Sequence, residues 1–206
     1  MEETKGPIKV SIIMPVYNQE ELVLRALDSI PDRPDIEVLC INDGSTDRTW
    51  EVLNNYKRLP NLRLFNNPQN MGIGYTRNVG FDNATGYWLY GLDSDDAYDT
   101  EGFNLVVDNL DKLEEYDLVH VHLIDNKGQY WRYPGLCAFH TYFLKRSVLG
   151  NIRCPNKNYG EDRAVLMLIR ATKKPKEITI TEPVFYLYNN PREGSATDLF
   201  AKGIRR

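Results

Sequence analysis

Residues 87–96 read Tyr-Trp-Leu-Tyr-Gly-Leu-Asp-Ser-Asp-Asp, an apolar run that ends in an acidic cluster, and they are the most informative part of the sequence. The first six residues are apolar enough to form a buried strand, and three carboxylates (Asp93, Asp95 and Asp96) come next, at its carboxyl end. Carboxylates this close together repel one another unless a cation lies among them or they are well solvated. Because open α/β sheets bind ligands beyond the carboxyl ends of their strands, the cluster predicts a metal and phosphate site.

Three further strands are predicted on the amino-terminal side of this stretch. Apolar runs at residues 10–14, 36–41 and 62–65 are each followed by a turn and then by a helical segment. Asn18 is expected to cap the first of these helices. Strands that alternate with helices predict βαβ units and a parallel sheet. The loops after the four strands should therefore form one crevice at one edge of the sheet.

The second half of the chain lacks this alternation. Residues 118–124 and 129–133 flank a turn signal and predict a hairpin, whereas residues 139–144 predict a strand and residues 162–172 a helix packed on the sheet. The sequence contains no repeat, low-complexity segment or linker. We therefore expect a single domain over residues 1–206, with two halves that meet near residue 96.

Composition limits the class of protein. A chain of 206 residues with 42% hydrophobic residues can bury one sizeable core. The net charge of −4 excludes the basic footprint of a general nucleic-acid binder. The amino terminus is polar, unlike a secretory signal. No apolar run approaches the roughly 20 residues that cross a bilayer. We expect a soluble, cytoplasmic protein whose association with a membrane, if any, is peripheral.

The three cysteines do not form a pattern typical of a structural zinc site, because no two are spaced as C-x-x-C. An odd number of cysteines favours a reducing compartment. Cys40 is expected in the core, and Cys154 in an exposed loop. His120 and His122 alternate on one predicted strand, but two histidines without a further ligand do not make a metal site.

Five short motifs carry a resemblance to a known family. They are P-V-Y-N at residues 15–18, N-D-G-S-T-D at 42–47, N-M-G-I-G-Y-T-R-N at 70–78, D-S-D-D at 93–96 and Y-G-E-D at 159–162. In this order and spacing they resemble the family 2 glycosyltransferases, which are inverting, nucleotide-sugar-dependent enzymes. The resemblance is continuous over roughly residues 8–100 and resumes at the Y-G-E-D motif.

The resemblance implies a single-domain GT-A fold, Rossmann-like, with a mixed, mainly parallel sheet flanked by helices. Residues of about 8–96 would form the nucleotide-binding half, and residues of about 97–206 the acceptor-binding half. The expected nucleotide-sugar contacts are Pro15, Tyr17, Asn18, Asp43, Arg77, Asp93 and Ser94.

The metal site is assigned by the same resemblance. Asp95 would ligate the metal directly, and Asp93 would contact the ribose, the metal or its water shell. Mn²⁺ or Mg²⁺ suits carboxylate, water and phosphate ligands. Asp96 receives no role beyond capping the next segment of the chain. The alternative is a solvated turn with helix-capping aspartates.

Asp43 and Arg77 have distinct expected roles in binding the donor. A carboxylate only accepts hydrogen bonds, and uracil and thymine carry an N3–H, so Asp43 favours a UDP or dTDP donor. Pro15 and Tyr17 would form an apolar wall against the base, or else pack as ordinary core residues. The guanidinium of Arg77 would hold the diphosphate bidentately; alternatively, Arg77 is a surface arginine paired with an acidic neighbour.

The resemblance makes Asp162 the catalytic base and Glu161 a helper or acceptor contact. Inverting transfer needs a base that takes the proton of the acceptor as its oxygen attacks the anomeric carbon. The positive end of a helix would stabilise Asp162 as the anion; the alternative role is helix capping. Many members of the family have a basic residue where Asn189 stands here, and Arg192 is the substitute that we expect.

The predicted function is metal-dependent, inverting transfer of a single sugar from a UDP-sugar or dTDP-sugar to an acceptor hydroxyl, as in polysaccharide biosynthesis. The acceptor is an unknown glycan, lipid-linked or protein molecule. One alternative is a non-catalytic module that binds a nucleotide-sugar or a glycan. The other is a sugar-phosphate nucleotidylyltransferase, which should carry a glycine- and arginine-rich loop after the first strand; residues 15–18 are not such a loop.

Overall fold

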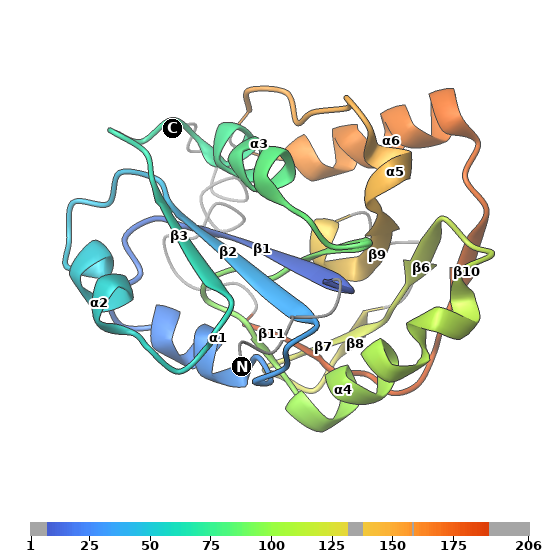
Figure 1. The fold of residues 1–206 in the computed structure, drawn as a ribbon, viewed down its shortest axis with the longest axis horizontal. Helices are drawn as coiled ribbons and strands as arrows, with labels where there is room; N and C mark the ends of the chain where they lie inside the picture. Colours follow the sequence, from blue (N-terminus) through green and yellow to red (C-terminus); the bar gives the residue numbers. More distant parts are fainter. Residues whose placement is uncertain (1–7, 132–137, 158, 190–206) are drawn as a thin grey trace, which may run out of the picture.

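A seven-stranded mixed sheet forms the centre of the molecule (Figure 1) in a computed structural model that describes residues 8–131, 138–157 and 159–189. In spatial order its strands are β10 (Glu177–Thr179), β6 (Leu118–His120), β9 (Tyr142–Lys145), β4 (Trp88–Gly91), β1 (Val10–Val16), β2 (Ile36–Asn42) and β3 (Leu62–Asn66). Only β9 runs antiparallel to its neighbours. The predicted mixed, mainly parallel sheet is confirmed.

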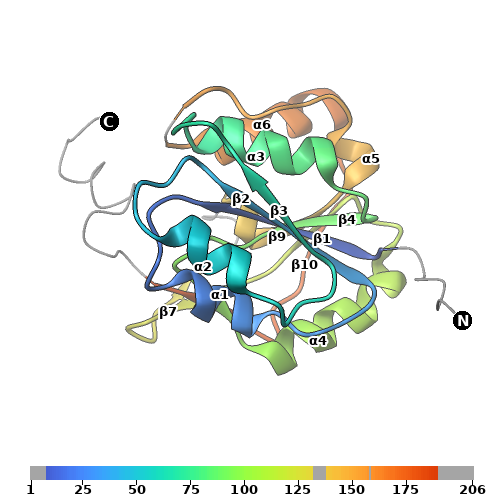
Figure 2. The ribbon, with the colours of Figure 1, turned by 60° about the vertical axis from the view of Figure 1, so that its left-hand side comes forward.

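Helices cover both faces of this sheet. They are α1 (Val23–Ser29), α2 (Thr49–Asn55), α3 (Ile73–Asn83), α4 (Thr100–Asn109), α5 (Arg146–Leu149) and α6 (Glu161–Lys173), with the short 3-10 helices η1 (Leu110–Leu113) and η2 (Phe139–Thr141). Helices α3, α5 and α6 lie on one face and α1, α2 and α4 on the other (Figures 1 and 2). A strand covered on both faces must be apolar throughout. Accordingly, Ile12 and Met14 of β1 join one core, and Ile13 joins the other.

A second, four-stranded sheet was not predicted. Its strands, in spatial order, are β5 (Ala97–Tyr98), β11 (Tyr186–Tyr188), β7 (Leu123–Asp125) and β8 (Tyr130–Trp131). The predicted hairpin exists as β7 and β8, which are antiparallel. However, the single strand expected over residues 118–124 is divided between the two sheets as β6 and β7. This small sheet brings the late strand β11 beside β5. Strand β5 directly follows the turn formed by Asp93, Ser94, Asp95 and Asp96, which we call the acidic turn.

Three local predictions were wrong. Helix α1 starts at Val23 rather than after Asn18, because the Asn18 side chain accepts a hydrogen bond from the Thr46 amide at 2.9 Å instead of capping a helix. The strand expected over residues 139–144 begins with η2 before β9. Cys154 is buried rather than exposed, and its amide and carbonyl both bond to the Asn78 side chain.

Among the residues that the structure describes, no helix has the length and apolar character that crossing a bilayer requires.

Candidate active site

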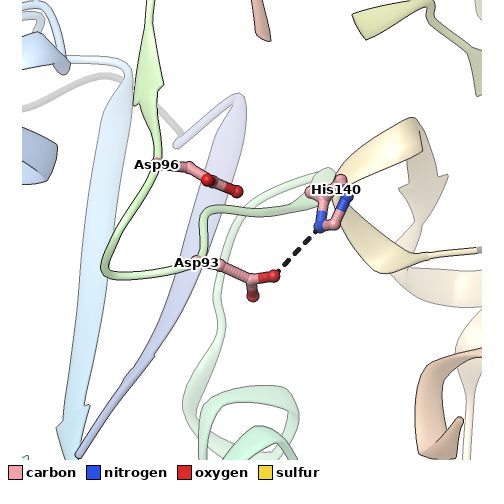
Figure 3. A group of neighbouring side chains, drawn as sticks. All are labelled: Asp93, Asp96 and His140. Carbon is pink, nitrogen blue, oxygen red and sulfur yellow. Dashed lines mark ion pairs between the residues drawn. The ribbon is translucent and has the colours of Figure 1, made fainter. Parts of the chain in front are cut away.

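The acidic turn lies between β4 and β5, where the Asp93 main-chain oxygen accepts a hydrogen bond from the Asp96 amide at 3.0 Å. Figure 3 shows the side chains of Asp93 and Asp96 together with that of His140, which comes from η2. One ligand atom from each of the three lies within 4.8 Å of the others. His140 Nδ1 is 3.2 Å from Asp93 Oδ2. His140 is isolated in the sequence, with no motif around it, and only the fold brings it to this site.

Asp96 is a buried structural acceptor and not the helix cap that we expected. Tyr186 Oη donates to one carboxylate oxygen at 2.6 Å, and the Asn189 amide donates to the other at 2.8 Å. Asp99 caps α4 instead. Burial, together with the neighbouring Asp93, raises the pKa of Asp96 to about 7. Asp96 thus connects β11 to the acidic turn through hydrogen bonds.

Arg77 joins the acidic turn to the Y-G-E-D motif. Its guanidinium is buried, with Nη2 3.1 Å from Asp93 Oδ1 and Nε 3.0 Å from Glu161 Oε1. Although burial opposes it, the positive charges of Arg77 and His140 hold the pKa of Asp93 well below its ordinary value. Burial raises the pKa of Glu161, and Arg77 offsets only part of that change. Nη1 of Arg77 is a buried donor without a hydrogen-bond partner among the described residues.

Asp162 stands half-buried in the first turn of α6, behind Gly160, whose φ of +71° a side chain would disfavour. Its carboxylate accepts hydrogen bonds from the Phe139 amide at 3.1 Å and the Arg163 amide at 2.6 Å. The first turn of the helix places amide groups with positive partial charge beside this carboxylate. Since a carboxylate has about four lone-pair sites, Asp162 keeps capacity to accept a proton from another molecule.

The Asp43 carboxylate stabilises the loop that follows β3, residues 67–72, through hydrogen bonds. Its carboxylate accepts hydrogen bonds from the Asn67 side chain at 2.8 Å, the Met71 amide at 2.9 Å and the Gly72 amide at 3.0 Å. This loop forms one wall of a cavity of about 440 Å³. The cavity is lined by Tyr17, Asn42, Gly44, Ser45, Thr46, Trp50, Asn66, Asn67, Pro68, Gln69 and Asn70. Of the two residues expected as an apolar wall, Tyr17 reaches the cavity, while Pro15 is buried in β1.

The remaining predicted residues are placed less centrally. Ser94 is buried in the acidic turn, and Asn18 is exposed beside the loop after β2. Asp95 is half-buried, and its main-chain oxygen accepts a hydrogen bond from Arg25 at 2.8 Å. Arg192 lies outside the described residues.

The carboxylate and imidazole groups of this site are suited to bind a divalent cation. Five carboxyl groups (Asp93, Asp95, Asp96, Glu161 and Asp162) lie near three basic groups (Arg25, Arg77 and His140), although burial raises the pKa of both Asp96 and Glu161. Such an excess is relieved by a bound cation, and carboxylate oxygens are ligands that Mg²⁺ and Mn²⁺ accept. Asp93 and Asp96 each offer a carboxylate oxygen, and His140 a ring nitrogen, close enough together to meet one cation. Asp95 as the direct ligand stays a prediction.

Comparison of the sequence with known families matches residues 11–178 to the family described as glycosyl transferase family 2. Among curated proteins, the chain is 28% identical to the minor teichoic acid biosynthesis protein GgaB of Bacillus subtilis over 98% of its own length. It is 32% identical to an uncharacterized glycosyltransferase of Rickettsia felis over 71% of its length. The chain spans 25% and 24% of these two proteins, respectively.

Solved structures share the fold. The structure of TarS from S. aureus in complex with UDP-GlcNAc superposes with a TM-score of 0.81 at 21% identity, covering 92% of this chain and 61% of that one. The mannosyltransferase PcManGT from Pyrobaculum calidifontis, in complex with GDP-Man and Mn²⁺, gives a TM-score of 0.70 at 19% identity, covering 93% and 61%. The predicted GT-A architecture is therefore confirmed.

Proposed function

Because this chain belongs to glycosyl transferase family 2, we propose that it moves one sugar from a UDP-sugar or dTDP-sugar donor to an acceptor hydroxyl, with inversion and with Mn²⁺ or Mg²⁺. One observation carries this proposal. Arg77 contacts both Asp93 of the acidic turn and Glu161 of the Y-G-E-D motif. Glu161 directly precedes Asp162, the residue expected to activate the acceptor, so the expected donor and acceptor residues belong to one connected site.

The acceptor half of the reaction is assigned to Asp162. Its carboxylate takes the proton of the acceptor hydroxyl while the hydroxyl oxygen forms a bond to the anomeric carbon. The bond from that carbon to the diphosphate oxygen breaks, and the leaving diphosphate keeps the electron pair. The Phe139 and Arg163 amides hold the carboxylate in one orientation, which limits the directions from which the acceptor can approach.

The donor half is assigned to the acidic turn and its neighbours. Asp93 and Asp95 are the residues that would hold the cation, which when bound offsets negative charge on the leaving diphosphate. The Arg77 Nη1 atom, a buried donor without a partner among the described residues, supports the role of Arg77 toward a diphosphate or sugar oxygen. The cavity beside Tyr17 suits a nucleoside. Pro15, Asn18, Asp43 and Ser94 stay predicted contacts.

The comparisons support a nucleotide-sugar donor, and two relatives suggest a class of acceptor. The similar TarS structure is in complex with UDP-GlcNAc. The similar PcManGT structure is in complex with GDP-Man and Mn²⁺. A poly(ribitol-phosphate) beta-glucosyltransferase of Bacillus spizizenii is 36% identical over 46% of this chain. Together with the teichoic acid biosynthesis protein GgaB, it supports a teichoic acid or poly(ribitol-phosphate) polymer as the acceptor. We assign residues 8–96 to the donor and 97–206 to the acceptor; cytoplasmic location stays a prediction.

Turnover of UDP-sugars with Mn²⁺ tests the proposal. We expect the wild type to release UDP from at least one donor and to stop when EDTA removes the metal. Asp95→Ala should lower the rate about 100-fold or more, and Asp162→Asn about 10²–10⁴-fold, since a general base contributes this much. Asp111→Asn, which alters an exposed ion pair with Lys9, is the control and should leave the rate unchanged. Unchanged rates in both site variants would refute the assignment.

A further inference from the structure

We propose that His140 is a positioning residue that fixes the geometry between the donor-binding Asp93 and the base Asp162. The proposal rests on the proposed function above. Its basis is that two adjacent residues of η2 contact the two halves of the site. His140 contacts Asp93 through its side chain, and Phe139 contacts Asp162 through its amide. No sequence motif marks either residue.

His140 is held on three sides. Its Nδ1 faces Asp93 Oδ2 at 3.2 Å (Figure 3). Its ring stacks on Tyr186, with centroids 4.6 Å apart and an interplanar angle of 19°. Its main-chain oxygen accepts a hydrogen bond from Tyr90 Oη at 2.6 Å. Because the side chain is buried and the backbone is anchored, the imidazole can place the Asp93 carboxylate with little freedom.

Phe139 is equally confined. Its ring packs edge-on against Phe81 at a centroid distance of 5.2 Å, and the Arg77 guanidinium lies 5.8 Å from the same ring. Its amide donates to Asp162 Oδ2 at 3.1 Å. The peptide link between Phe139 and His140 therefore connects the carboxylate at the donor to the carboxylate at the acceptor.

This connection matters because transfer requires a set separation between the anomeric carbon and the attacking oxygen. A misplacement of about 1 Å can reduce a rate about 100-fold. Asp93 sets the position of the donor, and Asp162 sets that of the acceptor hydroxyl. Loss of the His140 contact releases Asp93 from η2, so both donor affinity and the chemical step should suffer.

The competing explanation is that His140 only fills space beneath Tyr186. Two variants separate these explanations. His140→Asn places an amide N–H near the position of Nδ1 and loses the stacked ring. His140→Phe keeps the ring and loses the N–H. The control is His120→Phe, which removes another buried histidine whose Nε2 lies 2.6 Å from Glu177 on the neighbouring strand β10.

The experiment measures the Kd of UDP with Mn²⁺ by calorimetry, kcat and KM with UDP-GlcNAc, and Tm for each protein. We expect His140→Phe to raise Kd about tenfold and to lower kcat about tenfold. His140→Asn keeps a donor but loses the charge of the ion pair with Asp93, so its Kd and kcat should lie between those of His140→Phe and the wild type. His120→Phe should lower Tm without changing Kd. If His140→Phe does not fold, His140→Ala is compared with His140→Asn in the same measurements.

Each result decides the matter. His140→Phe that binds and turns over like the wild type would overturn the inference and leave the proposed function standing. Equal impairment of His140→Asn and His140→Phe would assign His140 to packing and would also overturn it. A wild type that binds no UDP with Mn²⁺ would overturn the proposed UDP donor itself, and this inference with it.

Discussion

Arg77 Nε lies 3.0 Å from Glu161 Oε1, and both side chains are buried, although Arg77 belongs to α3 and Glu161 begins α6. A buried ion pair gains little net stability over apolar residues, but removal of one partner leaves a charge without compensation. Nη2 of the same guanidinium reaches Asp93. Stability and site geometry therefore depend on one side chain.

We expect Arg77→Met to destabilise the protein by about 3–5 kcal/mol, because Glu161 and Asp93 lose their shared cation. The double variant with Arg77→Met and Glu161→Met should recover part of this loss, since it also removes the buried carboxylate. Chemical denaturation of both variants measures the difference. If Arg77→Met loses less than about 1 kcal/mol of unfolding free energy, the ion pair of Arg77 and Glu161 is not buried as described.

Asp43→Asn should both destabilise the protein and weaken UDP binding. The Met71 amide donates to Oδ1 of Asp43 and the Gly72 amide to Oδ2, so either orientation of the asparagine side chain turns its NH2 group toward one of these two donors. We expect a loss of about 1–3 kcal/mol, typical of an unpaired buried polar group. Thermal unfolding and UDP calorimetry are measured together. A loss of affinity without any loss of stability would instead assign Asp43 to contact with the base alone.

Glu37 should make stability depend on pH, far from the site. Burial alone would raise the pKa of Glu37. Hydrogen bonds from Ser11 and Thr85 outweigh this effect and hold the pKa below its ordinary value of 4.5. A depressed folded-state pKa gives stability that is fully present above pH 4.5 and is lost as the pH falls through the folded pKa.

Glu37→Gln should therefore cost more free energy of unfolding at pH 7 than at pH 3, which lies below the ordinary pKa of 4.5. Urea unfolding at the two pH values measures this difference in the free energy of unfolding. Equal costs at both pH values would mean that the charge of Glu37 does not contribute to stability.

Gly91→Ala should disturb the site by displacing η2. A Cβ atom at Gly91 would lie 2.8 Å from the Phe139 ring and 3.1 Å from the His140 amide, closer than side chains pack. We expect weaker UDP binding and slower turnover than in the wild type. Gly128→Ala is the control: it strains a residue with φ of +78° but meets no atom within 4 Å, so it should cost stability alone. Unchanged UDP affinity in Gly91→Ala would argue against a fixed η2.

Much of the fold was predictable because burial on both faces makes the strands of a parallel sheet continuously apolar. The strands β1, β2, β3 and β4 and the helix α6 appear close to their predicted ranges. The hairpin of β7 and β8 was predictable, but the second sheet as a whole was not, because it depends on β11 pairing with β5 and β7, which are distant in the sequence. The two-residue strand β5 carries too little periodicity to be recognised.

By itself, the sequence determined the order of strands and helices in the first half, the acidic turn at the end of β4 and the membership of glycosyl transferase family 2. These depend on local apolar patterns and short motifs. Only the tertiary structure placed His140 against Asp93 and buried Asp96 under Tyr186. It also made Arg77 a buried link to Glu161. Such contacts join residues far apart in the chain, and they exist only once the sheets and helices have packed.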